Sequence, residues 1–71
     1  MQTATTFAPD QILFGQLVWD GDEETMCARG TLAELIADAT DPGTDADHLY
    51  VRPYGLGKPA KFVEIPLPHK A

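Results

Sequence analysis

The feature that most constrains the fold is one short helix with clear boundaries near the middle of the chain. Thr31 and Glu34 have the spacing of a capping box. In this motif the threonine hydroxyl accepts from the backbone N–H three residues later, and the glutamate carboxylate accepts from the threonine N–H. The tripeptide Asp41-Pro42-Gly43 predicts the end of the helix, because a residue before proline avoids the helical conformation and glycine tolerates the turn that follows.

The helix carries a single apolar stripe, formed by Leu32, Leu35, Ile36 and Ala39. That stripe needs a second apolar surface, and the rest of the chain supplies strand-like segments on both sides of the helix. These segments are residues 11–19, 24–29, 48–54 and 61–67. The sequence therefore predicts an α+β fold in the order β-β-α-β-β, with two hairpins in one four-stranded antiparallel sheet and the helix packed on one face.

Alternation within the strands predicts which side chains face the helix. Leu49 and Val51 share one phase, whereas Tyr50, Arg52 and Tyr54 share the opposite phase. We therefore expect the two tyrosines to lie on the face that the helix does not cover.

Two glycines give further local expectations. Gly15 interrupts the first strand and predicts a bulge or a close backbone approach. Gly21 follows Asp20 directly after that strand, and Asp-Gly is a strong hairpin signal.

The length of 71 residues allows one domain, which we place at residues 11–71 after a flexible N-terminal arm at residues 1–10. A core this small leaves a stability margin of only about a few kcal/mol. Two routes can raise the margin: association, or good packing around the aromatic side chains. The latter are Phe14, Trp19, Tyr50, Tyr54 and Phe62.

The remaining composition bears on the compartment. The chain has no apolar run long enough for a membrane span, and its first residues lack the pattern of a secretory signal. Its single cysteine, Cys27, forms no internal disulfide, and its place in the middle of a strand predicts a small buried thiol. These features favour a cytoplasmic protein.

Charge is the strongest functional signal. The formal net charge of −6 disfavours direct binding to nucleic acid or to an anionic membrane. The charge is also uneven, because residues 20–47 hold nine acids and one base, whereas residues 48–71 hold four bases and one acid. The acidic segment, residues 20–47, can steer association with a basic surface, or it can be a solvated face that keeps the protein soluble.

Aspartates at the helix C-terminus oppose the helix dipole, so helix stability does not explain them, and they favour the binding interpretation. Outward-facing tyrosines are common interface anchors. The candidate partner-binding residues are Asp20, Asp22, Glu23, Glu24, Glu34, Asp38, Asp41, Asp45, Asp47, Tyr50 and Tyr54.

Other chemistries find little support. The aspartates around His48 lack the spacing of a calcium loop, and there is no paired-cysteine or histidine spacing for zinc. Gly55 and Gly57 resemble part of a phosphate loop, but Pro59 follows Lys58 where a serine or threonine is needed. We therefore predict no enzyme activity, no metal and no cofactor.

No motif identifies a family. In size, charge and absence of catalytic motifs, the chain is similar to the small acidic proteins with which phages and mobile elements disable host nucleic-acid machinery, such as anti-CRISPR and antirestriction proteins. This likeness implies an inhibitor or regulator that docks on a basic, nucleic-acid-binding surface of a larger protein, and it transfers no residue roles. The alternative is a small homodimer or accessory subunit that associates through a sheet edge or the tyrosine face.

Overall fold

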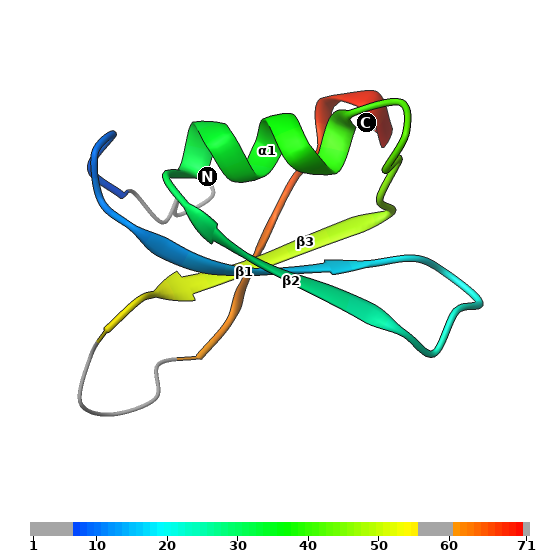
Figure 1. Cartoon of the computed structure of the whole chain (residues 1–71), viewed down its shortest axis with the longest axis horizontal. Helices are drawn as coiled ribbons and strands as arrows, with labels where there is room; N and C mark the ends of the chain where they lie inside the picture. Colours follow the sequence, from blue (N-terminus) through cyan, green and yellow to red (C-terminus); the bar gives the residue numbers. More distant parts are fainter. Residues whose placement is uncertain (1–6, 56–60, 71) are drawn as a thin grey trace, which may run out of the picture.

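The computed structural model describes residues 7–55 and 61–70 and confirms the predicted fold. Four antiparallel strands form one sheet in the order β2-β1-β3-β4, and one α-helix crosses it (Figure 1). The elements are β1 (Leu13–Val18), β2 (Thr25–Gly30), α1 (Leu32–Thr40), β3 (His48–Pro53), β4 (Val63–Ile65) and a 3-10 turn, η1 (Pro68–Lys70). Within the described ranges, no helix has the length and apolar character needed to cross a membrane.

The helix begins as the sequence predicts. The backbone N–H of Glu34 donates to Thr31 Oγ1 at 3.3 Å, and the backbone N–H of Thr31 donates to Glu34 Oε1 at 2.9 Å, which completes the capping box. Asp41 is the C-cap residue. Leu35 and Ala39 are fully buried beneath the helix, so the predicted stripe is the face that packs on the sheet.

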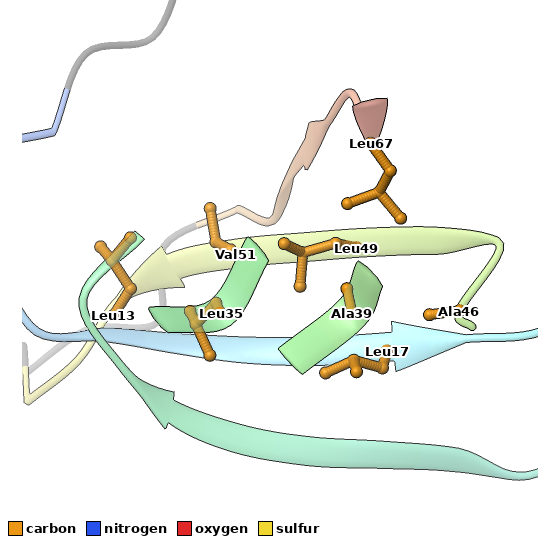
Figure 2. Close-up of a cluster of buried hydrophobic side chains, with 8 residues drawn as sticks. All are labelled: Leu13, Leu17, Leu35, Ala39, Ala46, Leu49, Val51 and Leu67. Carbon is orange, nitrogen blue, oxygen red and sulfur yellow. The ribbon is translucent and has the colours of Figure 1, made fainter. Parts of the chain in front are cut away.

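The core between α1 and the sheet is aliphatic (Figure 2). Its buried members are Leu13, Leu17, Leu35, Ala39, Ala46, Leu49, Val51 and Leu67. Aromatic packing was one of the two routes by which the stability margin could rise, but the helix-facing positions of β1 and β3 hold leucine, valine and Gly15. Of the aromatic residues named in that expectation, only Trp19 packs against the core.

Gly15 makes a close approach and not a bulge. The register of β1 runs unbroken from Leu13 to Val18 against both neighbouring strands. A Cβ atom at Gly15 would lie 3.0 Å from both Cδ1 and Cδ2 of Leu35. The glycine therefore lets the helix settle closely onto the central strand.

The connections differ from the sequence expectations in length. The hairpin between β1 and β2 is present, but its loop covers residues 19–24, with Gly21 at φ +79°. β4 holds only three residues, shorter than the predicted segment 61–67. The connection between the strand segments predicted at 48–54 and 61–67 falls largely on residues 56–60, and the predicted arm falls largely on residues 1–6. Both ranges lie outside the described residues. Phe7 packs against the core.

Candidate functional site

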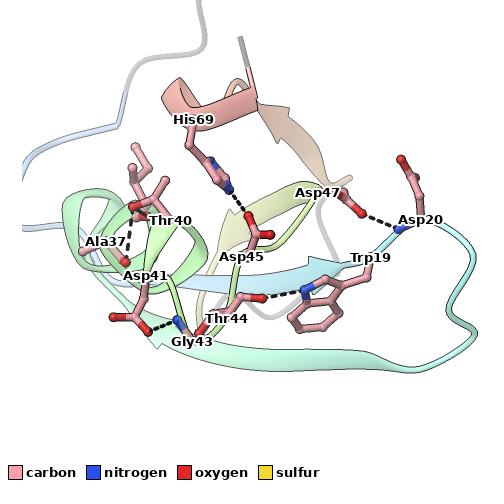
Figure 3. Close-up of polar contacts among 11 residues, drawn as sticks. Trp19, Asp20, Ala37, Thr40, Asp41, Gly43, Thr44, Asp45, Asp47 and His69 are labelled. Atoms are coloured by element: carbon pink, nitrogen blue, oxygen red, sulfur yellow. Dashed lines mark hydrogen bonds and ion pairs between the residues drawn. The ribbon is translucent and has the colours of Figure 1, made fainter.

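Two loops meet at the end of the sheet where β1 ends and β3 begins (Figure 3). The indole Nε1 of Trp19 donates to the backbone carbonyl of Thr44 at 2.7 Å. The backbone N–H of Asp20 donates to Asp47 Oδ2 at 2.7 Å, and the backbone N–H of Asp47 donates to the Val18 carbonyl at 3.0 Å. These three bonds hold the β1–β2 loop against the α1–β3 loop.

This arrangement collects most of the predicted acidic contacts, including those in the last turn of α1. We call the set the acidic end. Its members are Asp20, Asp22, Glu23, Glu24, Asp38, Asp41, Asp45 and Asp47.

The other three predicted contacts lie elsewhere. Glu34 is in the first turn of α1, at the opposite end of the helix. Tyr50 lies in the middle of β3 and stacks on His48, with ring centroids 6.1 Å apart. Tyr54 follows the far end of β3 and is 48 % exposed. The structure therefore joins the two acidic loops through Trp19 and Asp47, whereas Glu34 and Tyr54 lie at other places in the fold.

Several of these acids have local structural roles. Asp22 Oδ1 accepts from the backbone N–H of Glu24 at 3.0 Å, and Asp41 Oδ2 accepts from the backbone N–H of Gly43 at 3.0 Å. Such bonds stabilise turns. Asp41 thus has a role in the turn that ends the helix, a role that consideration of the helix dipole alone does not reveal.

Three acids of the acidic end form no side-chain hydrogen bond or ion pair within the described part of the chain. Glu23 and Glu24 in the loop and Asp38 on the helix have no side-chain partner among residues 7–55 and 61–70. All three are exposed. Their charges are the ones that the fold leaves available at this end.

His48 forms a contact that sequence reasoning missed. Its Nε2 lies 2.8 Å from Asp20 Oδ1, and its Nδ1 lies 2.9 Å from Glu64 Oε2. The hydrogen bond to Glu64, followed by the one to Asp20, raises the pKa of His48 above its ordinary value. The imidazole thus ties the end of β1 to β4 across β3. The sequence predicts which face of its strand His48 lies on, but its pairing with Glu64 depends on the order of the strands in the sheet.

A second missed pair lies nearby. His69 Nε2 is 3.1 Å from Asp45 Oδ1, which attaches η1 to the α1–β3 loop (Figure 3). Asp45 has φ +46°, a conformation that aspartate adopts more readily than most residues.

Two further predictions concern metal ligands and the single thiol. No group of three or more His, Cys, Asp or Glu side chains there is arranged to hold a metal ion. Cys27 is exposed, which corrects the prediction of a buried thiol. The reason is its phase in β2, because Cys27 pairs with Gln16 on the face opposite α1.

We call the sheet face opposite α1 the outer face. At one end of it Phe14 lies directly between Arg29 of β2 and Arg52 of β3. The Arg52 guanidinium lies over the rings of Phe14 and Phe62, at 5.1 and 5.3 Å from their centroids. We call the set Arg29, Phe14, Arg52 and Phe62 the arginine row.

Tyr54 lies beside the arginine row. Arg29 Nη1 donates to the Tyr54 hydroxyl at 3.1 Å, and its guanidinium lies 5.2 Å from the centre of that ring. A hollow of about 350 Å³ opens here, lined by Phe14, Arg52, Pro53, Tyr54 and Gly55.

No protein-family model, no curated protein and no solved structure matches this chain. The class of molecule is therefore defined by its own geometry. It is a small α+β domain with an acidic end and, at the other end of its sheet, a row of arginines on aromatic rings.

Proposed function

We propose that this chain is a non-enzymatic binding protein that docks its acidic end on a basic surface of a larger protein. The observation that supports this is that two loops rich in acids, the β1–β2 loop and the α1–β3 loop, meet at one end of the sheet (Figure 3). Bonds from Trp19 to Thr44 and from Asp20 to Asp47 hold the two acidic loops together, so the charges are presented by a defined surface.

The electrostatics favour a basic partner. At the acidic end, Asp20 pairs with His48 and Asp45 pairs with His69. Arg29 and Arg52 instead contact aromatic rings on the outer face. The three acids that have no side-chain partner in the described part of the chain contribute a negative field at this end. Such a field accelerates encounter with a positive surface and weakens as salt is added.

The partner class follows from the same chemistry. A surface that accepts closely spaced carboxylates resembles one that accepts phosphates, since both are charge-assisted hydrogen-bond acceptors. We therefore propose a nucleic-acid-binding protein as the partner and inhibition or regulation in the cytoplasm as the role, in the manner of anti-CRISPR and antirestriction proteins of phages. In this proposal the chain does not itself bind nucleic acid.

The test uses the three acids that have no side-chain partner among the described residues, Glu23, Glu24 and Asp38. The triple variant Glu23→Gln, Glu24→Gln, Asp38→Asn removes their charge and leaves the turn and capping bonds in place. The tagged chain is used to capture proteins from a bacterial lysate at about 50 and about 300 mM salt, which shortens the screening length roughly twofold. Asp10→Asn, an exposed acid outside the acidic end, is the control.

We expect the parent chain and the control to retain a nucleic-acid-binding protein at low salt. Less of that protein should be retained at high salt, and added DNA should compete for it. The triple variant should lose it. Equal retention by the triple variant, or retention that DNA does not affect, would show that the acidic end is not the contact.

Homodimerisation is the second candidate function, and exposed apolar groups favour it. Met26 on edge strand β2 is 44 % exposed, and Phe62 and Tyr54 on the outer face are 40 % and 48 % exposed. A face four strands wide and six residues long offers only about 400 Å², roughly half of what each partner contributes to a standard interface. Analytical ultracentrifugation at high salt is the test. A dimer that persists there, unchanged in the triple variant, would favour this candidate.

A further inference from the structure

We propose that the arginine row binds a carboxylate-bearing, extended segment of a partner protein. This surface lies on the outer face, away from the acidic end, and the inference does not depend on the proposed function. It rests on the placement of two arginines, on the absence of acidic partners for them and on the hollow beside them.

The strand order builds the row. Arg29 and Arg52 pair with the same residue, Phe14, from opposite sides of β1. Two strand spacings place their Cα atoms about 10 Å apart. Phe62 continues the row, with its ring 6.0 Å from that of Phe14, centre to centre. Two planar cations thus alternate with two rings across the sheet.

The two arginines of the arginine row have no carboxylate partner in the described part of the chain. Within the described ranges, neither arginine lies within 4.0 Å of a carboxylate oxygen, in a chain with eleven acids. In addition, Arg52 Nε is buried and has no hydrogen-bond partner there. That atom is shielded from solvent, so an incoming carboxylate must bind the guanidinium through its other N–H groups.

The acids on either side of the row, Glu34 and Glu64, already form hydrogen bonds with other residues. Glu34 lines a hollow of about 430 Å³ with Arg29 and Tyr54, but its carboxylate accepts the capping bond from Thr31. Glu64 lies on the outer face and contacts His48. An incoming carboxylate therefore does not compete with an existing carboxylate partner of either arginine, since the described hydrogen-bond partner of Arg29 is the Tyr54 hydroxyl.

A protein carboxylate fits better than a nucleic acid. The guanidinium of Arg52 already lies over Phe14 and Phe62, which leaves these ring faces poorly placed to stack on a base. A strand of phosphates would also meet the net charge of −6, whereas one or two carboxylates meet mainly the local arginines. Arginine binds carboxylates through two parallel N–H bonds.

The hollow explains why the segment should also carry an apolar side chain. Its lining combines Arg52 with Phe14, Pro53 and Tyr54, so cationic and apolar groups lie side by side. An extended chain presents alternate residues to the same side about 6.8 Å apart, so an acid and an apolar residue two positions apart can reach both.

The experiment is an NMR titration of the full chain labelled with nitrogen-15. The probe is an extended octapeptide with one glutamate and one leucine two positions apart and uncharged polar residues elsewhere, so that both side chains face the same side. The first control is the same peptide with glutamine in place of the glutamate. A thymidine octanucleotide tests the nucleic-acid alternative. The variants are Arg29→Gln and Arg52→Gln, with Arg52→Lys to keep the charge. Lys70→Gln removes one charge from η1 as a matched control.

We expect the acidic peptide to shift the backbone signals of Arg29, Arg52 and Tyr54, and the glutamine peptide to shift none of them. Each Arg→Gln variant should weaken binding about tenfold. Lys70→Gln should leave binding unchanged. Arg52→Lys should bind more weakly than the parent, because lysine lacks the planar pair of donors. Since Arg29 is exposed, the Arg29→Gln result holds even if Arg52→Gln fails to fold.

Four results would overturn the inference. They are no shift at millimolar peptide, shifts confined to the acidic end, equal weakening by Lys70→Gln, and tighter binding of the octanucleotide to the same residues. Failure of this test leaves the acidic end untested, because neither Arg29 nor Arg52 lies there. The capture experiment with the triple variant therefore remains an independent test of the proposed function.

Discussion

Replacing Gly15 with alanine tests how closely the helix packs on the sheet. A Cβ atom at this position would lie 3.0 Å from both methyl carbons of Leu35, whereas carbon atoms pack best at about 3.5–4.0 Å. Leu35 is fully buried, so both methyls are confined. The leucine must move by roughly half an ångström or the helix must lift from β1.

Two effects set the magnitude. Overpacking in a core costs about 1–3 kcal/mol. Removing a glycine stabilises by about 0.4–1 kcal/mol where the backbone suits alanine, and Gly15 does not have the positive φ that would exclude it. We expect the Gly15→Ala change to lower the free energy of unfolding by about 1–2 kcal/mol, which corresponds to about 4–15 °C in Tm for a domain of this size.

A second substitution makes the reasoning specific. Leu35→Val removes both δ-carbons and alone costs roughly 1–2 kcal/mol. The total stability of 71 residues is about 4–10 kcal/mol, so the variant remains folded. In the Leu35→Val background we expect Gly15→Ala to be neutral or stabilising, because the space that the new methyl needs is then empty.

The assay is urea denaturation of the parent, both single variants and the double variant, followed by circular dichroism. The coupling free energy between the two sites should be about 1–3 kcal/mol. The reasoning is refuted if Gly15→Ala stabilises the parent, or if it costs the same in both backgrounds.

Two further predictions concern the ends of the strands. Because the pKa of His48 is raised in the folded state, its contacts with Asp20 and Glu64 stabilise the fold fully below the unfolded pKa of about 6.5, and this contribution is lost as pH rises through the folded pKa. We therefore expect the urea midpoint of the parent chain, measured between about pH 5 and pH 9, to fall as the pH becomes alkaline, and that of His48→Gln not to fall. If the two plots of midpoint against pH were parallel, this prediction would be contradicted. Trp19→Phe removes the donor to the Thr44 carbonyl and should lower the free energy of unfolding by about 1–2 kcal/mol, with faster amide hydrogen exchange in the α1–β3 loop as the check; unchanged exchange would show that the indole does not hold the loop.

The sequence was most informative where structure depends on near neighbours. The capping box of Thr31 and Glu34 and the stop at Asp41 fixed the helix, because these signals act within one turn. The faces of β3 followed from alternation, which buried Leu49 and Val51 under α1 as expected.

The candidate sites depended on information that alternation does not contain. Alternation placed Arg29 on one face of β2 and Arg52 on one face of β3, but not Phe14 between them. Only the order β2-β1-β3-β4 does so. The same holds for His48, whose contact with Glu64 requires β3 and β4 to be neighbours.

The acidic end shows both contributions. The sequence by itself determined that residues 20–47 are strongly acidic and that a short helix lies between two pairs of strands, because charge and short-range periodicity are properties of the chain. Only the tertiary structure decided that the two loops meet through Trp19 and Asp47, and that Glu34 and Tyr54 lie away from them. The physical reason is that strand pairing and loop contacts join residues distant in sequence, and the packing of the whole core selects them.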